Sequence, residues 1–317
     1  MDVVVTNGVH QDLALSYETK NKKSLWLKFL AFIGAHEFRS AEMWRAGLTE
    51  MVGSTFATFA LVGSIIGCMN SNVAAPVLLV PIVVFCVTFF ILIAVAPISG
   101  GFINPTFTFI ASLKGVVTIS RAIVYIVAQF IGTTIGFLLL KSVMSHDMTL
   151  KYFLAGCTIN AYGGTSGISP STAFVLEFSC TFLMCLLGVT VAFDKKRSKE
   201  LGPIMVYTVL GGCIALPVLI SSTITGSVGY SGAGLNPVRC LAPALLYGGP
   251  QLWNGFWVFL LGPFFACIMY YIFSINLPKE GLSWVEGEYD ISKLAGVCFK
   301  GPHDTPEHVH HKEKATF

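Results

Sequence analysis

Long apolar runs separated by short polar segments dominate the chain between residues 43 and 275. A helix needs roughly 20 apolar residues to cross a bilayer. Runs of about that length predict spanning helices at about 43–68, 75–98, 121–144, 171–193, 202–223 and 252–275. The pattern therefore predicts an all-α membrane protein with six transmembrane helices.

Two further apolar runs, at about 104–113 and 236–246, are too short to cross a membrane. Each follows a stretch rich in Ser and Gly and opens with an Asn-Pro pair. The pairs are Asn104-Pro105 and Asn236-Pro237. Asn is a preferred N-cap and Pro is favoured at the first helical position, so each pair predicts the start of a half-helix.

The half-helices fall in matching places of an internal repeat, whose copies cover about 43–144 and 171–275. The first span of each copy carries a glutamate, Glu50 or Glu177, which precedes the motif Asn of its copy by 54 or 59 residues. Three spans in each copy make the second copy inverted across the membrane. The half-helices should then enter from opposite faces and meet near the midplane.

Composition agrees with the membrane assignment. Charged residues make up 12% of the 317 residues, about half of the share of about 25% in soluble domains. Lys and Arg gather before the first span and after the fourth, so the positive-inside rule predicts that both termini are cytosolic. No basic stripe lies away from the segments that flank the membrane, and nucleic-acid binding therefore has no support.

The remaining segments complete the predicted domain organisation. Residues 1–42 are expected to be a cytosolic segment without a signal peptide, with an amphipathic stretch at 24–38 in the membrane interface. Residues 43–275 form the membrane domain, and residues 276–317 a cytosolic tail. The nine cysteines lack metal-ligand spacing and no catalytic motif occurs, so no metal, cofactor or enzymatic activity is predicted.

The Asn-Pro pairs carry the candidate chemistry. A helix N-terminus has unsatisfied N–H groups and about half a positive charge, so two facing N-termini repel cations, protons included. The amides of Asn104 and Asn236 can both donate to one oxygen in a lumen between them. That oxygen's own hydrogens then point outward, which interrupts a proton-conducting chain of waters. The sequence therefore predicts a pore for uncharged molecules.

The two motif segments, Gly-Phe-Ile-Asn-Pro-Thr and Gly-Leu-Asn-Pro-Val-Arg, resemble the signature loops of the major intrinsic protein (aquaporin) family. The resemblance covers about residues 43–275 and includes Glu50 and Glu177. It implies a right-handed six-helix bundle with one pore per subunit, assembled as a homotetramer in the plasma membrane. In the family such glutamates accept hydrogen bonds from the loop backbone that leads into each half-helix.

Departures from the family pattern narrow the resemblance. Thr106 and Val238 stand where the family usually has Ala, and Cys240 follows the arginine of the second motif. A Gly-Cys pair that ends at Cys157 lies in the long loop after the third span. These features are similar to those of the X intrinsic proteins of plants and fungi, and a plant source is expected.

The resemblance also implies a narrow filter near the outer face. Alignment without gaps from the two motif asparagines places its four positions at Val84, Ile224, Ala233 and Arg239. An arginine inside a membrane is costly and usually functional, and its guanidinium offers hydrogen bonds to solute oxygens. With three aliphatic partners the filter should be wide, which favours glycerol, urea, hydrogen peroxide and boric acid over water.

Two other functions stay open. Ala244 and the pair Phe256-Trp257 resemble positions of water-selective channels, which favours a water channel. Glu50 and Glu177 are also the residue type of a proton relay, which would make the protein a proton-coupled transporter.

Three residues are candidates for regulation. Ser198 lies in a basic cytosolic segment that suits a kinase, and a phosphate there could pair with the neighbouring Lys and Arg side chains. Cys240, beside the motif arginine, is a candidate target of mercurials or oxidants. Cys157 is a candidate for a disulfide between subunits outside the cell.

Overall fold

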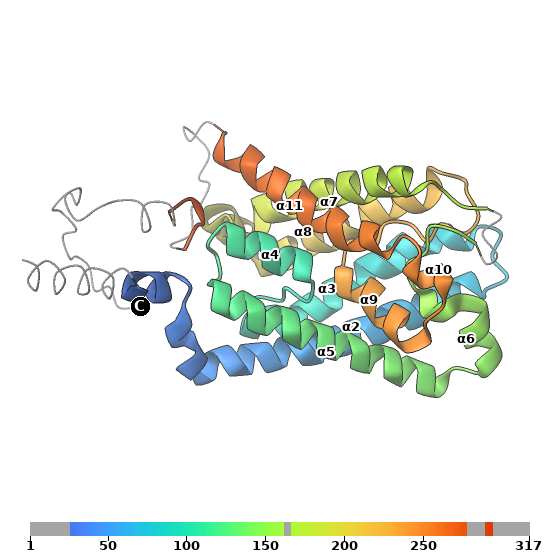
Figure 1. Ribbon diagram of the computed structural model, residues 1–317, viewed down its shortest axis with the longest axis horizontal. Helices are drawn as coiled ribbons and strands as arrows, with labels where there is room; N and C mark the ends of the chain where they lie inside the picture. Colours follow the sequence, from blue (N-terminus) through green and yellow to red (C-terminus); the bar gives the residue numbers. More distant parts are fainter. Residues whose placement is uncertain (1–25, 162–165, 278–288, 294–317) are drawn as a thin grey trace, which may run out of the picture.

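The computed structural model describes residues 26–161, 166–277 and 289–293. Within these residues, six helices are long and apolar enough to cross a membrane, as the sequence predicted. They lie along the long axis of the molecule in Figure 1. They are α2 (Ala41–Met69), α3 (Val80–Ser99, preceded by the 3-10 helix Pro76–Leu79), α5 (Ile119–Val143), α7 (Pro170–Ala192), α8 (Lys195–Thr223) and α11 (Phe256–Ile275).

Shorter elements connect these helices. The predicted half-helices are present as α4 (Pro105–Leu113) and α9 (Pro237–Tyr247). The others are a helix at 26–32, the 3-10 helices Ala35–Arg39 and Phe153–Ala155, α6 (His146–Tyr152) and α10 (Pro250–Trp253). The described part of the predicted stretch at 24–38 is thus a helix at 26–32, a turn at 33–34 and the beginning of the 3-10 helix Ala35–Arg39. Residues 1–25 and most of the predicted tail at 276–317 lie outside the described residues.

Helix boundaries follow the local sequence. The side chain of Asp194 accepts hydrogen bonds from the backbone N–H groups of Lys196 and Arg197 and so caps α8. Gly202 then leaves the helical conformation with φ 73°, directly before Pro203. The predicted span began only at residue 202 because residues 194–200 are mostly charged, whereas α8 begins at Lys195 and includes them. At the end of α3, Gly100 adopts φ 93° and stops the helix.

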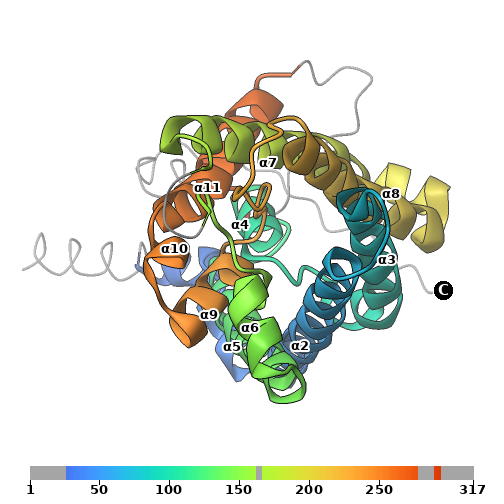
Figure 2. The same ribbon diagram turned by 90° about the vertical axis from the view of Figure 1, so that its right-hand side faces the viewer.

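The helices form a ring when the molecule is viewed along its length (Figure 2). The first repeat contributes α2, α3 and α5, and the second contributes α7, α8 and α11. Helix α3 packs against α8, so the repeats join along one side of the ring. The half-helices pack across the repeats, α4 against α11 and α9 against α5.

Small residues allow α2 and α5 to approach closely. A Cβ atom added to Gly132 would lie 2.1 Å from the carbonyl oxygen of Met51, and one added to Gly136 would lie 2.5 Å from that of Thr55. Both atoms belong to the α2 backbone and cannot move aside. Close backbone approach through small residues is a common way to join membrane helices, where apolar surface alone gives little driving force.

Residues 289–293 fold back onto the end of the first half-helix. The N–H of Ile291 donates to the carbonyl of Leu113 at 3.1 Å, which satisfies one of the free carbonyls at the end of α4. The hydroxyl of Tyr271 in α11 donates to the carboxylate of Asp290 at 2.6 Å, and Asp290 is fully buried. The segment therefore ties the last turn of α4 to α11.

We expect Gly132→Ala to lower the free energy of unfolding by about 1–3 kcal/mol, because the new methyl group collides with backbone atoms of α2. Thermal unfolding of the detergent-solubilised protein measures the loss. Gly67→Ala is the matched control, since Gly67 also lies in a helix and has no neighbour within 4 Å of the added Cβ. Equal melting temperatures for the two variants would contradict the proposed helix contact.

Candidate functional site

Each half-helix begins at the asparagine of its motif. The side-chain oxygen of Asn104 accepts a hydrogen bond from the N–H of Thr106 at 2.9 Å. That of Asn236 accepts from Val238 at 3.2 Å and from Arg239 at 3.4 Å. Both asparagines are therefore N-caps, followed by Pro105 and Pro237 at the first helical positions, where a missing N–H costs no hydrogen bond.

The two N-termini meet in the interior of the ring. The amide nitrogen of Asn104 donates to the carbonyl of Leu235 at 3.0 Å, and that of Asn236 points to the carbonyl of Ile103 at 3.5 Å. Each asparagine thus reaches the residue that precedes the other one. Each amide group also has a second hydrogen, which the cross-repeat contact does not use.

The residues that receive these contacts have unusual backbone conformations. Ile103 and Leu235 have φ values of 50° and 57°, in the left-handed region that non-glycine residues rarely adopt. Ile is β-branched, so its conformation is the more costly of the two. The surrounding hydrogen bonds must offset this strain.

Two buried glutamates provide much of that support. The carboxylate of Glu177 accepts from the N–H groups of Gly234 and Leu235, both at 2.7 Å. The carboxylate of Glu50 accepts from Phe102 at 3.0 Å and from Ile103 at 2.6 Å. Both glutamates are fully buried and occupy equivalent places in the two repeats.

Glu50 has two further partners. The hydroxyl of Ser99 donates to it at 2.5 Å and the amide of Gln129 at 2.9 Å. The same amide of Gln129 donates to the hydroxyl of Thr108 in α4, also at 2.9 Å. The first glutamate therefore belongs to a network that joins α2, α3, α4 and α5.

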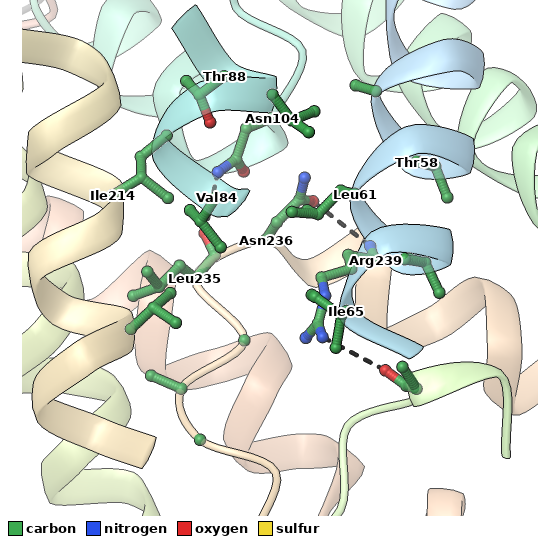
Figure 3. A pocket seen from close by; sticks show the side chains of 18 of the residues that line it. Thr58, Leu61, Ile65, Val84, Thr88, Asn104, Ile214, Leu235, Asn236 and Arg239 are labelled. Atoms are coloured by element: carbon green, nitrogen blue, oxygen red, sulfur yellow. Dashed lines mark hydrogen bonds between the residues drawn. The ribbon is translucent and has the colours of Figure 1, made fainter. Parts of the chain in front are cut away.

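Both asparagines and Arg239 line a cavity of about 500 Å³. Figure 3 shows these polar groups and side chains from the surrounding helices. Aliphatic residues of α2, α3 and α8 form most of the wall, among them Leu61, Ile65, Val80, Val84, Ile91, Ile214 and Val218. Hydroxyl-bearing residues of α2, α3 and α8 on the wall are Thr58, Thr88 and Ser222, and those of the loops and α6 are Tyr152, Thr158, Tyr230 and Ser231.

Three of the four predicted filter residues line this cavity: Val84, Ala233 and Arg239. The assignment of Ile224 was wrong. It follows the last residue of α8, is 67% exposed and lies outside the cavity wall.

The wall of α8 repeats every four residues, at Leu210, Ile214, Val218 and Ser222. Since a helix turns by about 100° per residue, Ile224 lies about 200° around the axis from Ser222. Sequence reasoning missed Ser222, although this four-residue spacing was a signal that could have found it.

Arg239 is held from the side of the loop after α6. Its guanidinium donates to the carbonyl of Ala155 at 3.3 Å and to the sulfur of Cys157 at 3.2 Å. A guanidinium has five N–H donors, so these contacts leave donors for a molecule in the cavity.

The predictions for the two candidate regulatory cysteines require correction. Cys157 and Cys240 form a disulfide with each other inside one chain. The loop after α6 turns into the mouth of the cavity and brings the two Cα atoms to 5.1 Å. Cys157 is therefore not a thiol that can cross-link subunits, and Cys240 is not a free target for mercurials.

The other predicted residues lie away from the cavity wall. Thr106 and Val238 are buried behind the asparagines. Ser198 is half-buried in the first turns of α8, where its N–H donates to the carbonyl of Asp194 at 2.8 Å. Among the described residues, no group of three or more His, Cys, Asp and Glu side chains could hold a metal ion.

Comparisons with known proteins agree with this arrangement. A family model described as "Major intrinsic protein" matches residues 37–272. Aquaporin TIP1-1 of Arabidopsis thaliana is 31% identical over 191 residues, which cover 59% of this chain and 68% of the relative. A PIP-type aquaporin of Atriplex canescens is 31% identical over 242 residues, which cover 75% of this chain and 81% of the relative.

A solved structure shares the fold. The X-ray structure of the aquaglyceroporin from Plasmodium falciparum aligns with a TM-score of 0.61 at 19% identity. The alignment covers 74% of this chain and 96% of that one.

Glu177→Gln tests the support of the second loop. The amide that replaces one carboxylate oxygen would face a backbone N–H, and a buried donor without a partner costs about 1–3 kcal/mol. We expect thermal unfolding at a correspondingly lower temperature. Glu200→Gln is the matched control, because Glu200 is exposed near the start of α8. A Glu177→Gln protein as stable as the control would show that the two hydrogen bonds contribute little.

Proposed function

This chain belongs to the major intrinsic protein family and is a passive multi-pass membrane channel, and we propose that it conducts small uncharged solutes. The proposed permeants are glycerol, urea, hydrogen peroxide and boric acid. Water permeability is low beside that for these solutes, and ions and protons are excluded.

The observation that carries this proposal is the division of the cavity wall into two kinds of surface. Aliphatic side chains of α2, α3 and α8 supply most of the wall, and the amides of Asn104 and Asn236 with the guanidinium of Arg239 supply hydrogen-bond donors. A molecule with hydroxyl groups on one side and an apolar carbon skeleton on the other suits both surfaces. Water gains no hydrogen bonds from the aliphatic side chains.

Exclusion of ions follows from charge. Two half-helix N-termini and Arg239 place positive charge along the path, which repels cations and hydronium. A water oxygen that accepts hydrogen bonds from both asparagines has its hydrogens directed away from the centre. A proton therefore meets both an electrostatic barrier and an interrupted hydrogen-bond chain.

The alternatives have less support. Among the residues for which water selectivity was considered, Ala244 is fully buried, and Trp257 stacks on Phe174 at 5.8 Å between ring centroids. Neither contributes to the cavity wall. Glu50 and Glu177 also lie outside that wall. Their carboxylate oxygens accept hydrogen bonds from the loop backbone, so these two residues do not form a proton relay along the path.

We place the protein in the plasma membrane as a homotetramer with both termini in the cytosol. Disulfides persist in oxidising compartments, so the Cys157–Cys240 bridge supports an extracellular position for that mouth. Helix α6 lies at one end of the long axis, and residues 26–39 and 289–293 lie at the other (Figure 1). Ser198, near the basic start of α8, is the proposed site for a kinase.

Stopped-flow measurements on proteoliposomes test the solute preference. We expect glycerol and peroxide uptake well above that of protein-free vesicles, with a small increase in water permeability. Arg239→Val should admit protons, detected with an enclosed pH dye, because a central positive charge and its donors are lost. Fast water flux without glycerol or peroxide uptake in the unmodified protein would refute the proposal and favour a water channel.

The corrected wall residue provides a second test. We expect Ser222→Phe to reduce glycerol uptake by about tenfold or more, because Ser222 lines the cavity and a phenylalanine ring there would occupy part of the path. Ile224→Phe adds an aromatic ring two residues away but outside the wall, so uptake should be retained. Equal inhibition by the two substitutions would argue against the assignment of Ser222.

A further inference from the structure

Thr106 completes a ring of hydrogen bonds at the centre of the channel. Its N–H donates to the side-chain oxygen of Asn104 at 2.9 Å. The amide nitrogen of Asn104 donates to the carbonyl of Leu235 at 3.0 Å, and the Thr106 hydroxyl donates to that same carbonyl at 3.0 Å. Three residues from two repeats thus form a closed circuit, and Thr106 is fully buried behind it.

The equivalent circuit in the second repeat is open. The N–H of Val238 donates to the side-chain oxygen of Asn236 at 3.2 Å, and the Asn236 amide lies 3.5 Å from the carbonyl of Ile103. Valine has the shape of threonine but no hydroxyl. The third hydrogen bond of the ring therefore cannot form, and the remaining contact across the repeats is at the limit of hydrogen-bond length.

The two repeats differ in the hydrogen bonds that the carbonyls of Leu235 and Ile103 accept. The N–H of Leu235 donates to the carboxylate of Glu177 at 2.7 Å. The carbonyl of Leu235 accepts from both Asn104 and Thr106, which uses both of its lone pairs. The N–H of Ile103 donates to the carboxylate of Glu50 at 2.6 Å. Among the described residues, the carbonyl of Ile103 has one long contact, with the amide of Asn236 at 3.5 Å. The amide of Asn104 thus shares its acceptor with a second donor, whereas the amide of Asn236 has one long contact. The side-chain oxygen of Asn236 is held by the N–H groups of Val238 and Arg239, so the difference lies at the amide nitrogen.

We propose that the Thr106 hydroxyl is a positioning group that makes Asn104 the rigid side of the central constriction, while Val238 leaves Asn236 as the yielding side. The permeability consequence rests on the proposed function. Both asparagines line the cavity, whereas Thr106 does not, so Thr106 acts only through Asn104 and Leu235. A solute wider than water passes by displacing the asparagine amide that is held less firmly.

Each substitution should change the ratio of glycerol to water permeability in a defined direction. A typical internal hydrogen bond changes an equilibrium or a rate by about fivefold. Thr106→Val opens the first ring without changing side-chain volume, so it should raise the ratio of glycerol to water permeability by about that factor. Val238→Thr supplies the missing hydroxyl to Ile103 and should lower the ratio to a similar extent. The double variant exchanges the two rings and should lie near the unmodified protein.

The experiment measures glycerol and water permeability of the four proteins in proteoliposomes by stopped-flow light scattering. Thr106→Ser retains the hydroxyl but lacks the methyl group, and its ratio should stay near that of the unmodified protein. Thr134→Val is a control for loss of a threonine hydroxyl elsewhere, because that hydroxyl donates to the carbonyl of Phe130 within α5. The melting temperature in detergent should be lower for Thr106→Val than for the Thr134→Val control, because Thr106→Val removes a buried hydrogen bond between the two repeats.

The outcomes separate the inference from the function. An unmodified protein that conducts water but no glycerol would overturn the proposed function, while the unfolding series would still support or refute the ring. Unchanged ratios and unchanged melting temperatures in Thr106→Val and Val238→Thr would overturn the ring. A Thr106→Ser protein with the permeability ratio of Thr106→Val would also overturn it, because the methyl group rather than the hydroxyl would then set that ratio.

Discussion

Two stretches of non-helical backbone lie at membrane depth in this protein, and their polar groups cannot rely on lipid for hydrogen bonds. Glu50 and Glu177 meet this requirement, since each carboxylate takes two backbone N–H groups from the loop that leads into a half-helix. The supported loops can then hold Ile103 and Leu235 in strained conformations. Those conformations turn the carbonyls toward the opposite repeat and bring Asn104 and Asn236 together.

The repeats share this scheme but differ in detail, and the differences lie where a permeating molecule passes. The first glutamate belongs to a network with Ser99 and Gln129, whereas Arg239 occurs only in the second motif. The arginine is held by the loop that Cys157 and Cys240 fasten to α9. The inverted symmetry thus builds the passage, and departures from symmetry determine what it admits.

Much of the fold could be predicted from the sequence, because its signals are local. Spanning helices follow from the length of apolar runs, and the half-helices follow from Asn-Pro pairs after Gly-rich segments. The placement of Ile224 failed because the position was counted along the chain from Asn236, whereas the face of α8 that borders the cavity follows the four-residue spacing that ends at Ser222. The pairing of Cys157 with Cys240 was missed because connectivity among nine cysteines cannot be deduced from sequence. The Thr106–Leu235 contact joins residues 129 positions apart, and no local pattern reports it.

The contact between Ile291 and Leu113 has a consequence for biosynthesis. The end of the first half-helix is completed by a residue translated 178 positions later, after all of the spanning helices. A nascent chain can therefore thread its early helices into the bilayer long before the first re-entrant segment acquires its final anchor. Insertion and closure are separate events, and the six spanning helices have all been translated before the second one occurs.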